Sequence, residues 1–353
     1  MSLSGRVDQA QRRFGAFGYP IAVVYKFYDD QGGYLAALIT YYGFLSLFPM
    51  LLLLTTVLGF VLHGHAGLQQ DLVDSALAQF PVIGAELRND VTQIRGSTSA
   101  LVVGIVVSLY GSLGVAQALQ HALDKVWAVP RQARPNPLLS RVRSLGLVGL
   151  LGVGVLVTAG LSAVTTGAGI LGADIGPWSR LVAGLLSTVS NAGLFLLAFT
   201  LLTAQRPSIR DVWVGAIAAA VGFQLLQTVG AYYLNHRLRG ASQVYGTFGL
   251  VLGLLAWIYI EAVIVVFAAE ANVVRRRRLY PRALLTPFTD DVELTEHDRR
   301  AYASYAKGEQ FKKHERVDVT FHDPLASPRR PAGNIADPVD SNKEADEEAD
   351  EAD

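Results

Sequence analysis

The run "LAALITYYGFLSLFPMLLLLTTVLGFVL", from Leu35 to Leu62, decides the fold class. It holds no charged residue and is long enough to cross the hydrocarbon core of a bilayer, which takes about 20 helical residues. A soluble core helix of ordinary length would end near Pro49, because proline lacks the N–H group and its ring collides with the carbonyl of Leu45. The apolar run continues past Pro49, so we expect a long membrane helix with a kink.

Further runs of the same kind follow along the chain. Of the 353 residues 51% are apolar and only 17% are charged. The apolar residues form continuous blocks instead of the alternating segments of a membrane β-barrel. The expected spans are residues 35–62, 98–122, 144–171, 178–203, 209–234 and 246–274. The sequence therefore predicts an all-α, polytopic membrane protein with six transmembrane helices.

The segments around this transmembrane domain, residues 34–280, differ in composition. Residues 1–33 mix aromatic positions with a lysine and aspartates, which is typical of a helix lying at the membrane interface. The loop 64–97 has the apolar spacing of two short amphipathic helices on the outer side. Residues 281–353 are polar and end in "NKEADEEADEAD", so we expect a disordered acidic tail.

The distribution of positive charge predicts the orientation. Arginine and lysine gather before the first span, in the loop 123–143 and directly after the last span, whereas the loops after the first and third spans carry few. Both termini are therefore expected in the cytoplasm, with the protein in the inner, or cytoplasmic, membrane. The arginines after the last span are also expected to contact anionic lipid; they are Arg275, Arg276, Arg277 and Arg278.

Polar side chains inside the expected spans are the candidate functional residues. Facing them toward lipid would be costly, so they should face the bundle interior or a wet cavity. Two interpretations stay open: a hydrogen-bond network that locks the helices together, or a polar path for a substrate headgroup. The set consists of Tyr42, Ser46, Pro49, Gln117, Gln120, His121, Asp124, Gln224, Gln227, Trp257, Glu261 and Asn272.

The kink at Pro49 needs a local hydrogen-bond partner. Proline leaves a carbonyl of the preceding turn without its donor, and Ser46 or a neighbouring helix can supply one. Tyr42, Ser46 and Pro49 fall within about 60° of one another on a helical projection. The kink is therefore expected either to pack against a neighbouring helix or to line a cavity.

Two glutamates of the last span have different expected states. Glu261 lies near the bilayer midplane, where an uncompensated charge costs at least ~2.5–3.5 kcal/mol. No lysine or arginine stands at similar depth in the six runs, so we expect a neutral, hydrogen-bonded Glu261 that shares a face with Trp257 and Asn272. Glu270 points the other way, near Arg275, and an ion pair at the membrane edge is expected there.

Three segments together resemble the YihY / virulence factor BrkB family of bacterial inner-membrane proteins. They are "YYGFLSLFPMLLLL" from Tyr41, "SLYGSLGVAQALQHALDKVWAVPR" from Ser108 and "YGTFGLVLGLLAWIYIEAVIVVFAAEANVV" from Tyr245. The resemblance spans roughly residues 20–280 and implies a six-helix inner-membrane protein. Asp124 stands where the family usually has asparagine, and Ala268 stands where it usually has glycine.

Members of this family have been labelled ribonuclease BN, but the residues argue against a nuclease. A zinc-dependent nuclease needs a cluster such as H-x-H-x-D-H to hold a metal-activated water. This chain offers only "HGHAG", with His63 and His65, and it lacks phosphate-loop and nucleophile-elbow motifs. We therefore expect no enzymatic activity, no metal, no cofactor and no nucleic-acid partner.

The function predicted from these observations is the movement or handling of an amphiphilic envelope component, such as a lipid. The kinked first span, the polar residues and the outer amphipathic loop would form a groove for its headgroup. The alternative is a non-transporting scaffold that recruits envelope proteins through the acidic tail. The two halves of the membrane domain show no internal repeat of the transporter kind, which argues against a conventional secondary transporter.

Overall fold

The computed structural model is all-helical in the part of the chain that it describes. That part comprises residues 15–61, 98–136, 138–147, 149–150, 154, 177–237, 242–284 and 293–321. Its helices are α2 (Gly15–Asp29), α3 (Gly32–Val61), α6 (Thr98–Val126), α8 (Pro177–Leu202), α9 (Ile209–Arg237), α10 (Ser242–Arg277) and α11 (Glu296–Gly308), with the short 3-10 helix η1 (Arg131–Ala133). Residues 138–147 are also helical. No strand occurs in these ranges, which confirms the predicted all-α class.

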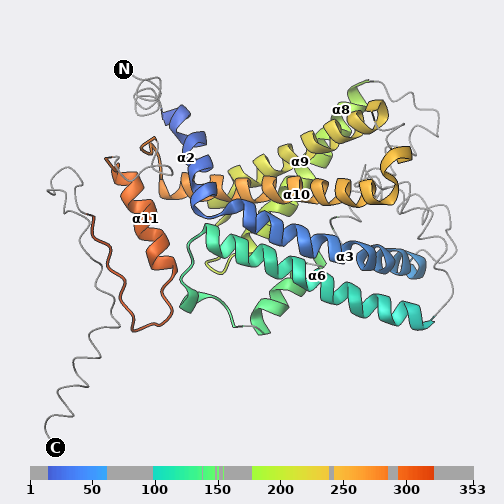
Figure 1. The fold of residues 1–353 in the computed structure, drawn as a ribbon, viewed down its shortest axis with the longest axis horizontal. Helices are drawn as coiled ribbons and strands as arrows, with labels where there is room; N and C mark the ends of the chain where they lie inside the picture. Colours follow the sequence, from blue (N-terminus) through green and yellow to red (C-terminus); the bar gives the residue numbers. More distant parts are fainter. Residues whose placement is uncertain are drawn as a thin grey trace, which may run out of the picture.

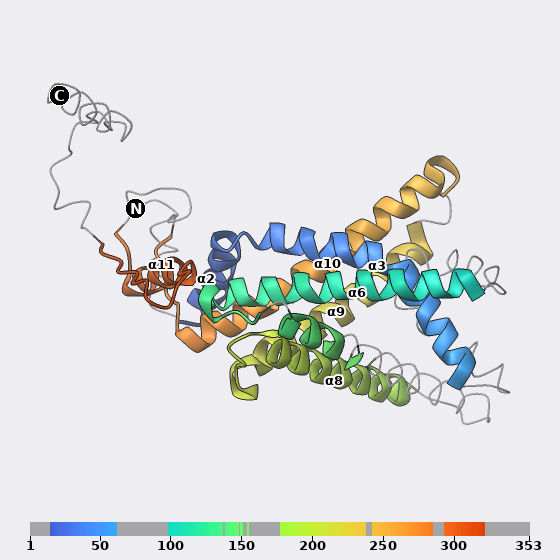
Figure 2. The ribbon, with the colours of Figure 1, turned by 90° about the horizontal axis from the view of Figure 1, so that it is seen from below.

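The long helices form an elongated bundle (Figure 1). Helix α3 packs on α6 and α10, α9 packs between α8 and α10, and α6 reaches both α8 and α10. Helix α2 packs mainly against α10, and α11 lies across one end of the bundle (Figures 1 and 2). We call this the charged end, and define it as residues 26–30, 126–127, 270–283 and helix α11.

The described helices contain three segments long and apolar enough to cross a membrane: Gly184–Leu202, Ile209–Gly230 and Val251–Arg277. They match the expected fourth, fifth and sixth spans. The apolar segment Gly32–Leu47 of α3 is shorter. Most of the expected third span lies outside the described residues, and so do the loop 64–97 and the two histidines His63 and His65. The number of six spans therefore stays a prediction.

Helix α3 continues through Pro49, as predicted, and it bends in its second half (Figure 2). Its first half packs tightly on α6. A Cβ atom at Gly111 would lie 2.9 Å from the Cα of Ser46, and one at Gly114 would lie 2.4 Å from the ring of Tyr42. Small residues at such positions let helix backbones approach closely, which is how helices associate in lipid.

Helices α9 and α10 are antiparallel and also approach closely at glycines. A Cβ atom at Gly215 would lie 2.1 Å from the carbonyl oxygen of Ala268, and one at Gly230 would lie 2.2 Å from the ring of Trp257. The start of α9 therefore lies beside the end of α10, and this pairing creates the groove described below.

Candidate functional site

The amino group of Lys26 is the centre of the charged end. It contacts the carboxylate of Asp30, lies 3.0 Å from Oε2 of Glu270, and donates to the carbonyl oxygen of Val126 at 2.8 Å. Lys26 and Glu270 are fully buried and Asp30 is nearly so. The ammonium donates hydrogen bonds to Asp30, directly after α2, and to the Val126 carbonyl at the end of α6, and it pairs by charge with Glu270 of α10. Lys26 therefore joins three helices through two hydrogen bonds and an ion pair.

The charge of Lys26 is stabilised by its partners. Burial alone lowers the pKa of Lys26, but the carboxylates of Glu270 and Asp30 raise it further than burial lowers it, and the pKa ends above its ordinary value. The ring of Tyr305 from α11 also faces the ammonium, 5.4 Å from its centroid. The lysine thus remains a cation although no water reaches it.

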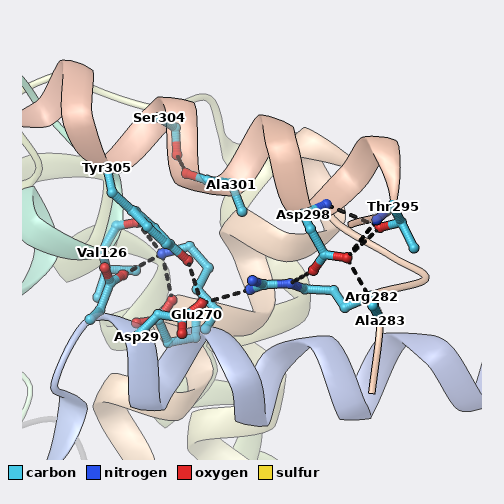
Figure 3. Close-up of polar contacts among 12 residues, drawn as sticks. Asp29, Val126, Glu270, Arg282, Ala283, Thr295, Asp298, Ala301, Ser304 and Tyr305 are labelled. Atoms are coloured by element: carbon cyan, nitrogen blue, oxygen red, sulfur yellow. Dashed lines mark hydrogen bonds and ion pairs between the residues drawn. The ribbon is translucent and has the colours of Figure 1, made fainter. Parts of the chain in front are cut away.

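A second ion-pair group attaches α11 to the bundle (Figure 3). The buried guanidinium of Arg282 donates from Nε to Asp298 of α11 at 2.7 Å and from Nη1 to Asp29 of α2 at 2.8 Å. The hydroxyl of Tyr305 donates to the same Asp29 carboxylate at 3.2 Å. Burial raises the pKa of Tyr305 well above its ordinary value, and Asp30 and Asp29 raise it further.

Local sequence explains why α11 begins where it does. Thr295 and Asp298 form a capping box, in which each side chain accepts the backbone N–H of the other residue. The same Asp298 carboxylate accepts the backbone N–H of Ala283 at 2.9 Å. One buried aspartate therefore starts the helix, pairs with Arg282 and fixes the segment after α10.

These contacts correct three expectations. Residues 281–353 were expected to be a disordered tail, but residues 293–321 include the docked helix α11. Residues 285–292 and 322–353 of the expected tail lie outside the described residues. Glu270 pairs with Lys26 and not with Arg275, because α2 packs on the face of α10 that carries Glu270. Lys26, which was counted among the positive charges that predict the orientation, is buried in the helix bundle and does not lie at the surface.

An apolar groove lies between α9 and α10. It has a volume of about 280 Å³ and is lined by Ala218, Val263, Ile264, Phe267, Ala268 and Ala271. Phe27 of α2 stacks on Phe267 with ring centroids 3.9 Å apart, so α2 borders one side. The exposed side chains of Ile217 and Val221 flank the groove on α9, so it opens at the outer surface of the bundle.

The four arginines after the last span do not act alike. Arg275 lies over the ring of Trp213 at 4.9 Å and donates to the carbonyl of Arg210 at 3.4 Å. Arg276 pairs through Nε with Asp211 at 2.8 Å, with a side chain that is 61% exposed. Arg277 turns inward and donates to the carbonyl oxygen of Trp127. Arg278 is exposed. Three of the four arginines are therefore available at the surface.

The predicted site residues of the first span are packed against α6. Tyr42 and Ser46 contact Gly114 and Gly111, so the two do share a face. Ser46 Oγ donates to the carbonyl of Gly43 at 3.0 Å and not to that of Leu45, because a helical serine reaches back three or four residues. These contacts favour the packed kink over a cavity. The side chain of Pro49 lies outside the described residues.

The four candidate residues of the second span follow i, i+3, i+4, i+7 spacing and form a polar stripe on α6, which divides into two pairs. Gln120 is buried and bonds Ser144 Oγ at 2.9 Å, and Asp124 accepts the N–H of Ala204 at 2.8 Å. Gln117 and His121 are exposed on the bundle surface instead. The predicted inward orientation was wrong for these two, since the stripe lies at the boundary between the packed and open faces of α6. The buried pair locks neighbouring segments together.

The other predicted residues take different positions along the bundle. Trp257 Nε1 donates to Glu261 Oε1 at 2.7 Å, the hydrogen bond expected on that face. Asn272 is buried and accepts the N–H of Gly215 at 2.6 Å. Gln224 and Gln227 are half-buried on α9. The twelve residues therefore do not converge on one continuous path in the described part of the chain.

The charged end was not predicted from the sequence, although a signal was present. Lys26 and Asp30 are spaced by four residues at the end of an apolar helix, and Glu270 stands among alanines. Buried charges are normally paired, so three charges in apolar surroundings indicate partners from other segments. The motif from Thr295 to Asp298 also matches a capping box. The pairs of Lys26 with Glu270 and of Arg282 with Asp29 join residues more than two hundred positions apart, which the sequence pattern does not reveal.

The fold and these sites define an α-helical integral membrane protein whose helices are joined at one end by buried ion pairs. The model of the family described as virulence factor BrkB matches residues 23–290. The chain belongs to this family.

Named relatives are membrane proteins. The chain is similar to the "Inner membrane protein YhjD" of Escherichia coli, with 30% identity over 69% of this chain and 77% of the relative. It is also similar to a "UPF0761 membrane protein" of Pseudomonas aeruginosa, with 25% identity over 74% of this chain and 65% of the relative. No solved structure gives a significant match.

Proposed function

We propose that this protein binds and moves an amphiphilic lipid of the bacterial envelope, with an acyl chain of the lipid in the groove between α9 and α10. The observation that carries the proposal is the groove itself, whose lining is apolar throughout. The proposed role involves no covalent step and no cofactor.

The groove has the character of a site for a hydrocarbon chain. Ala218, Ala268 and Ala271 lack the bulk to fill the space between the helices, and an apolar cavity does not hold water. Within a bilayer the available filler is lipid. An acyl chain lying there gains van der Waals contact with both helices, which is the main attraction between apolar surfaces in lipid.

The groove also leads toward a polar mouth. Phe267, Ala271 and Arg275 follow one another at intervals of four along α10, so they lie on one helical face. A lipid in the groove would thus have its headgroup near the charged end. We place this end in the cytoplasm, because the exposed arginines gather there. Reporter fusions after residues 206 and 285 should read as cytoplasmic, and fusions after 90 and 174 as outside.

The proposal is tested by filling the groove. Purified full-length protein is examined by native mass spectrometry for retained lipid, and reconstituted vesicles are assayed for headgroup accessibility on the two leaflets. We expect wild type to retain lipid and Ala218→Phe to retain much less. The matched control is Ile217→Phe, which adds the same ring at the neighbouring exposed position outside the groove.

The opposite result is also informative. If wild type retains no lipid and leaves headgroup accessibility unchanged, the lipid proposal is wrong. The non-transporting scaffold that recruits envelope proteins would then be the better interpretation.

A further inference from the structure

We infer that the lipid of the α9–α10 groove is an anionic phospholipid whose phosphate is bound at the groove mouth by Arg275 and Arg276. This inference rests on the proposed function and names the headgroup class for the same site.

Positive charge is concentrated at this mouth. Arg275 and Arg276 are exposed at the end of α10 and contact Arg210 and Asp211 at the start of α9. Further exposed arginines stand in the adjoining segments: Arg206, Arg210 and Arg278. Within the described segments 203–213 and 271–278, Asp211 is the single carboxylate. The mouth therefore presents a net positive surface at the point where the apolar lining ends.

The guanidinium groups of Arg275 and Arg276 are positioned by contacts with residues at the start of α9. Arg275 rests on the half-exposed ring of Trp213 and uses one donor on the carbonyl of Arg210. Arg276 uses Nε on Asp211. A guanidinium has five N–H donors in a planar fork that matches phosphate oxygens. Both groups thus keep donors for a ligand, and Trp213 and Asp211 limit the side-chain freedom that binding would otherwise cost.

The length of the groove fits one leaflet. At 1.5 Å per helical residue, the path from Arg275 to Phe267 is roughly 12 Å and the path to Val263 roughly 18 Å. Half of a hydrocarbon core is about 15 Å thick. A phosphate at Arg275 therefore places its acyl chain along the whole apolar lining.

Arginines elsewhere in the protein provide the contrast. Arg277 belongs to the same tract but is used inside the protein, on the carbonyl of Trp127. Arg141 is exposed in another basic segment and does not border the groove. If positive charge served only orientation in the membrane, removal of Arg141 and removal of Arg275 would have similar effects on lipid retention.

The test compares phosphatidylglycerol with phosphatidylethanolamine of identical acyl chains. Full-length protein is reconstituted in equimolar vesicles, extracted and examined by native mass spectrometry. Wild type should retain phosphatidylglycerol preferentially. The double variant Arg275→Gln/Arg276→Gln should lose about thirty-fold of that preference, as two surface charges facing an anion predict, while it still retains lipid. The control Arg141→Gln should keep the full preference.

Salt provides a second measurement that needs no variant. Because exposed charges are screened, the preference of wild type should fall as ionic strength rises. A preference for phosphatidylglycerol that persists in high salt or in the double variant would overturn the inference. Loss of that preference in millimolar inorganic phosphate would also overturn it, because it would indicate a site for a soluble anion. Retention of lipid without any headgroup preference would overturn the inference but leave the groove proposal standing. Absence of retained lipid would overturn both.

Discussion

The charged end and the middle of the bundle are held together in different ways. At the charged end, Lys26 and Arg282 are completely buried and connect α2, α6, α10 and α11 through carboxylates and carbonyls. Farther along the bundle, Gly111 and Gly230 bring helices into contact without any charge. The comparison teaches that backbone shape sets the spacing of the spans, whereas ion pairs attach the segments outside them.

The largest effect is expected from Lys26→Met, which removes the ammonium that Asp30 and Glu270 share. Loss of one partner from a buried ion pair costs about 3–5 kcal/mol, because the remaining charge stays buried without compensation. Thermal unfolding in detergent measures the change. Lys125→Met is the matched control, since its contact with Glu309 at 3.6 Å is partly exposed and such pairs contribute about 0–1 kcal/mol. Equal stability of the two variants would show that the charged end does not hold the fold.

A smaller effect is expected from Gly215→Ala, where the start of α9 packs against α10 without an ion pair. The new methyl group would lie 2.1 Å from the carbonyl oxygen of Ala268, so α9 and α10 must separate, and overpacking of this kind costs about 1–3 kcal/mol. Gly193→Ala has open space around it and should be neutral or stabilising by up to about 1 kcal/mol. Comparison of the two melting temperatures tests the role of close helix approach. A neutral Gly215→Ala variant would contradict it.

Tyr305→Phe tests the attachment of α11 and its dependence on pH. It removes the hydrogen bond to Asp29, and we expect a loss of about 0.5–1.5 kcal/mol. Burial raises the pKa of Tyr305. The stabilisation that its neutral hydroxyl contributes is therefore fully present below the ordinary tyrosine pKa of about 10, and it is lost as the pH rises toward the higher pKa of Tyr305 in the folded protein. Proteolysis of α11 should therefore increase above pH about 10, and less steeply in Tyr305→Phe. Tyr28→Phe, at an exposed position, should behave as wild type.

The smallest effect on stability is expected from Glu261→Gln. The amide oxygen still accepts the N–H of Trp257, so the free energy of unfolding should change by less than about 0.5 kcal/mol. If Glu261 takes up and releases a proton as a headgroup passes, headgroup movement in vesicles should nevertheless be lost, because an amide does not titrate. Unchanged movement would assign Glu261 to packing alone.

The fold could be predicted from the sequence to the extent that it depends on local pattern. The run from Leu35 to Leu62 and the segment around Glu261 specify membrane helices by composition, and the contact of Trp257 with Glu261 follows from a spacing of four residues. The pairing of Lys26 with Glu270 depends on how α2 packs against α10, which no local pattern contains. Gln117 and His121 were misplaced because a polar stripe does not show which of its edges faces the bundle. The groove arises from alanines that are equally consistent with tight packing.

The charged end also sets an order on biosynthesis. Asp29 and Tyr305 are 276 residues apart, so at about 5 to 20 residues per second roughly 14 to 55 s separate their emergence from the ribosome. Until then Asp29 lacks its partners Arg282 and Tyr305, and a hydrated carboxylate opposes the docking of α2. Helix α2 therefore reaches its final place only after α11 is complete.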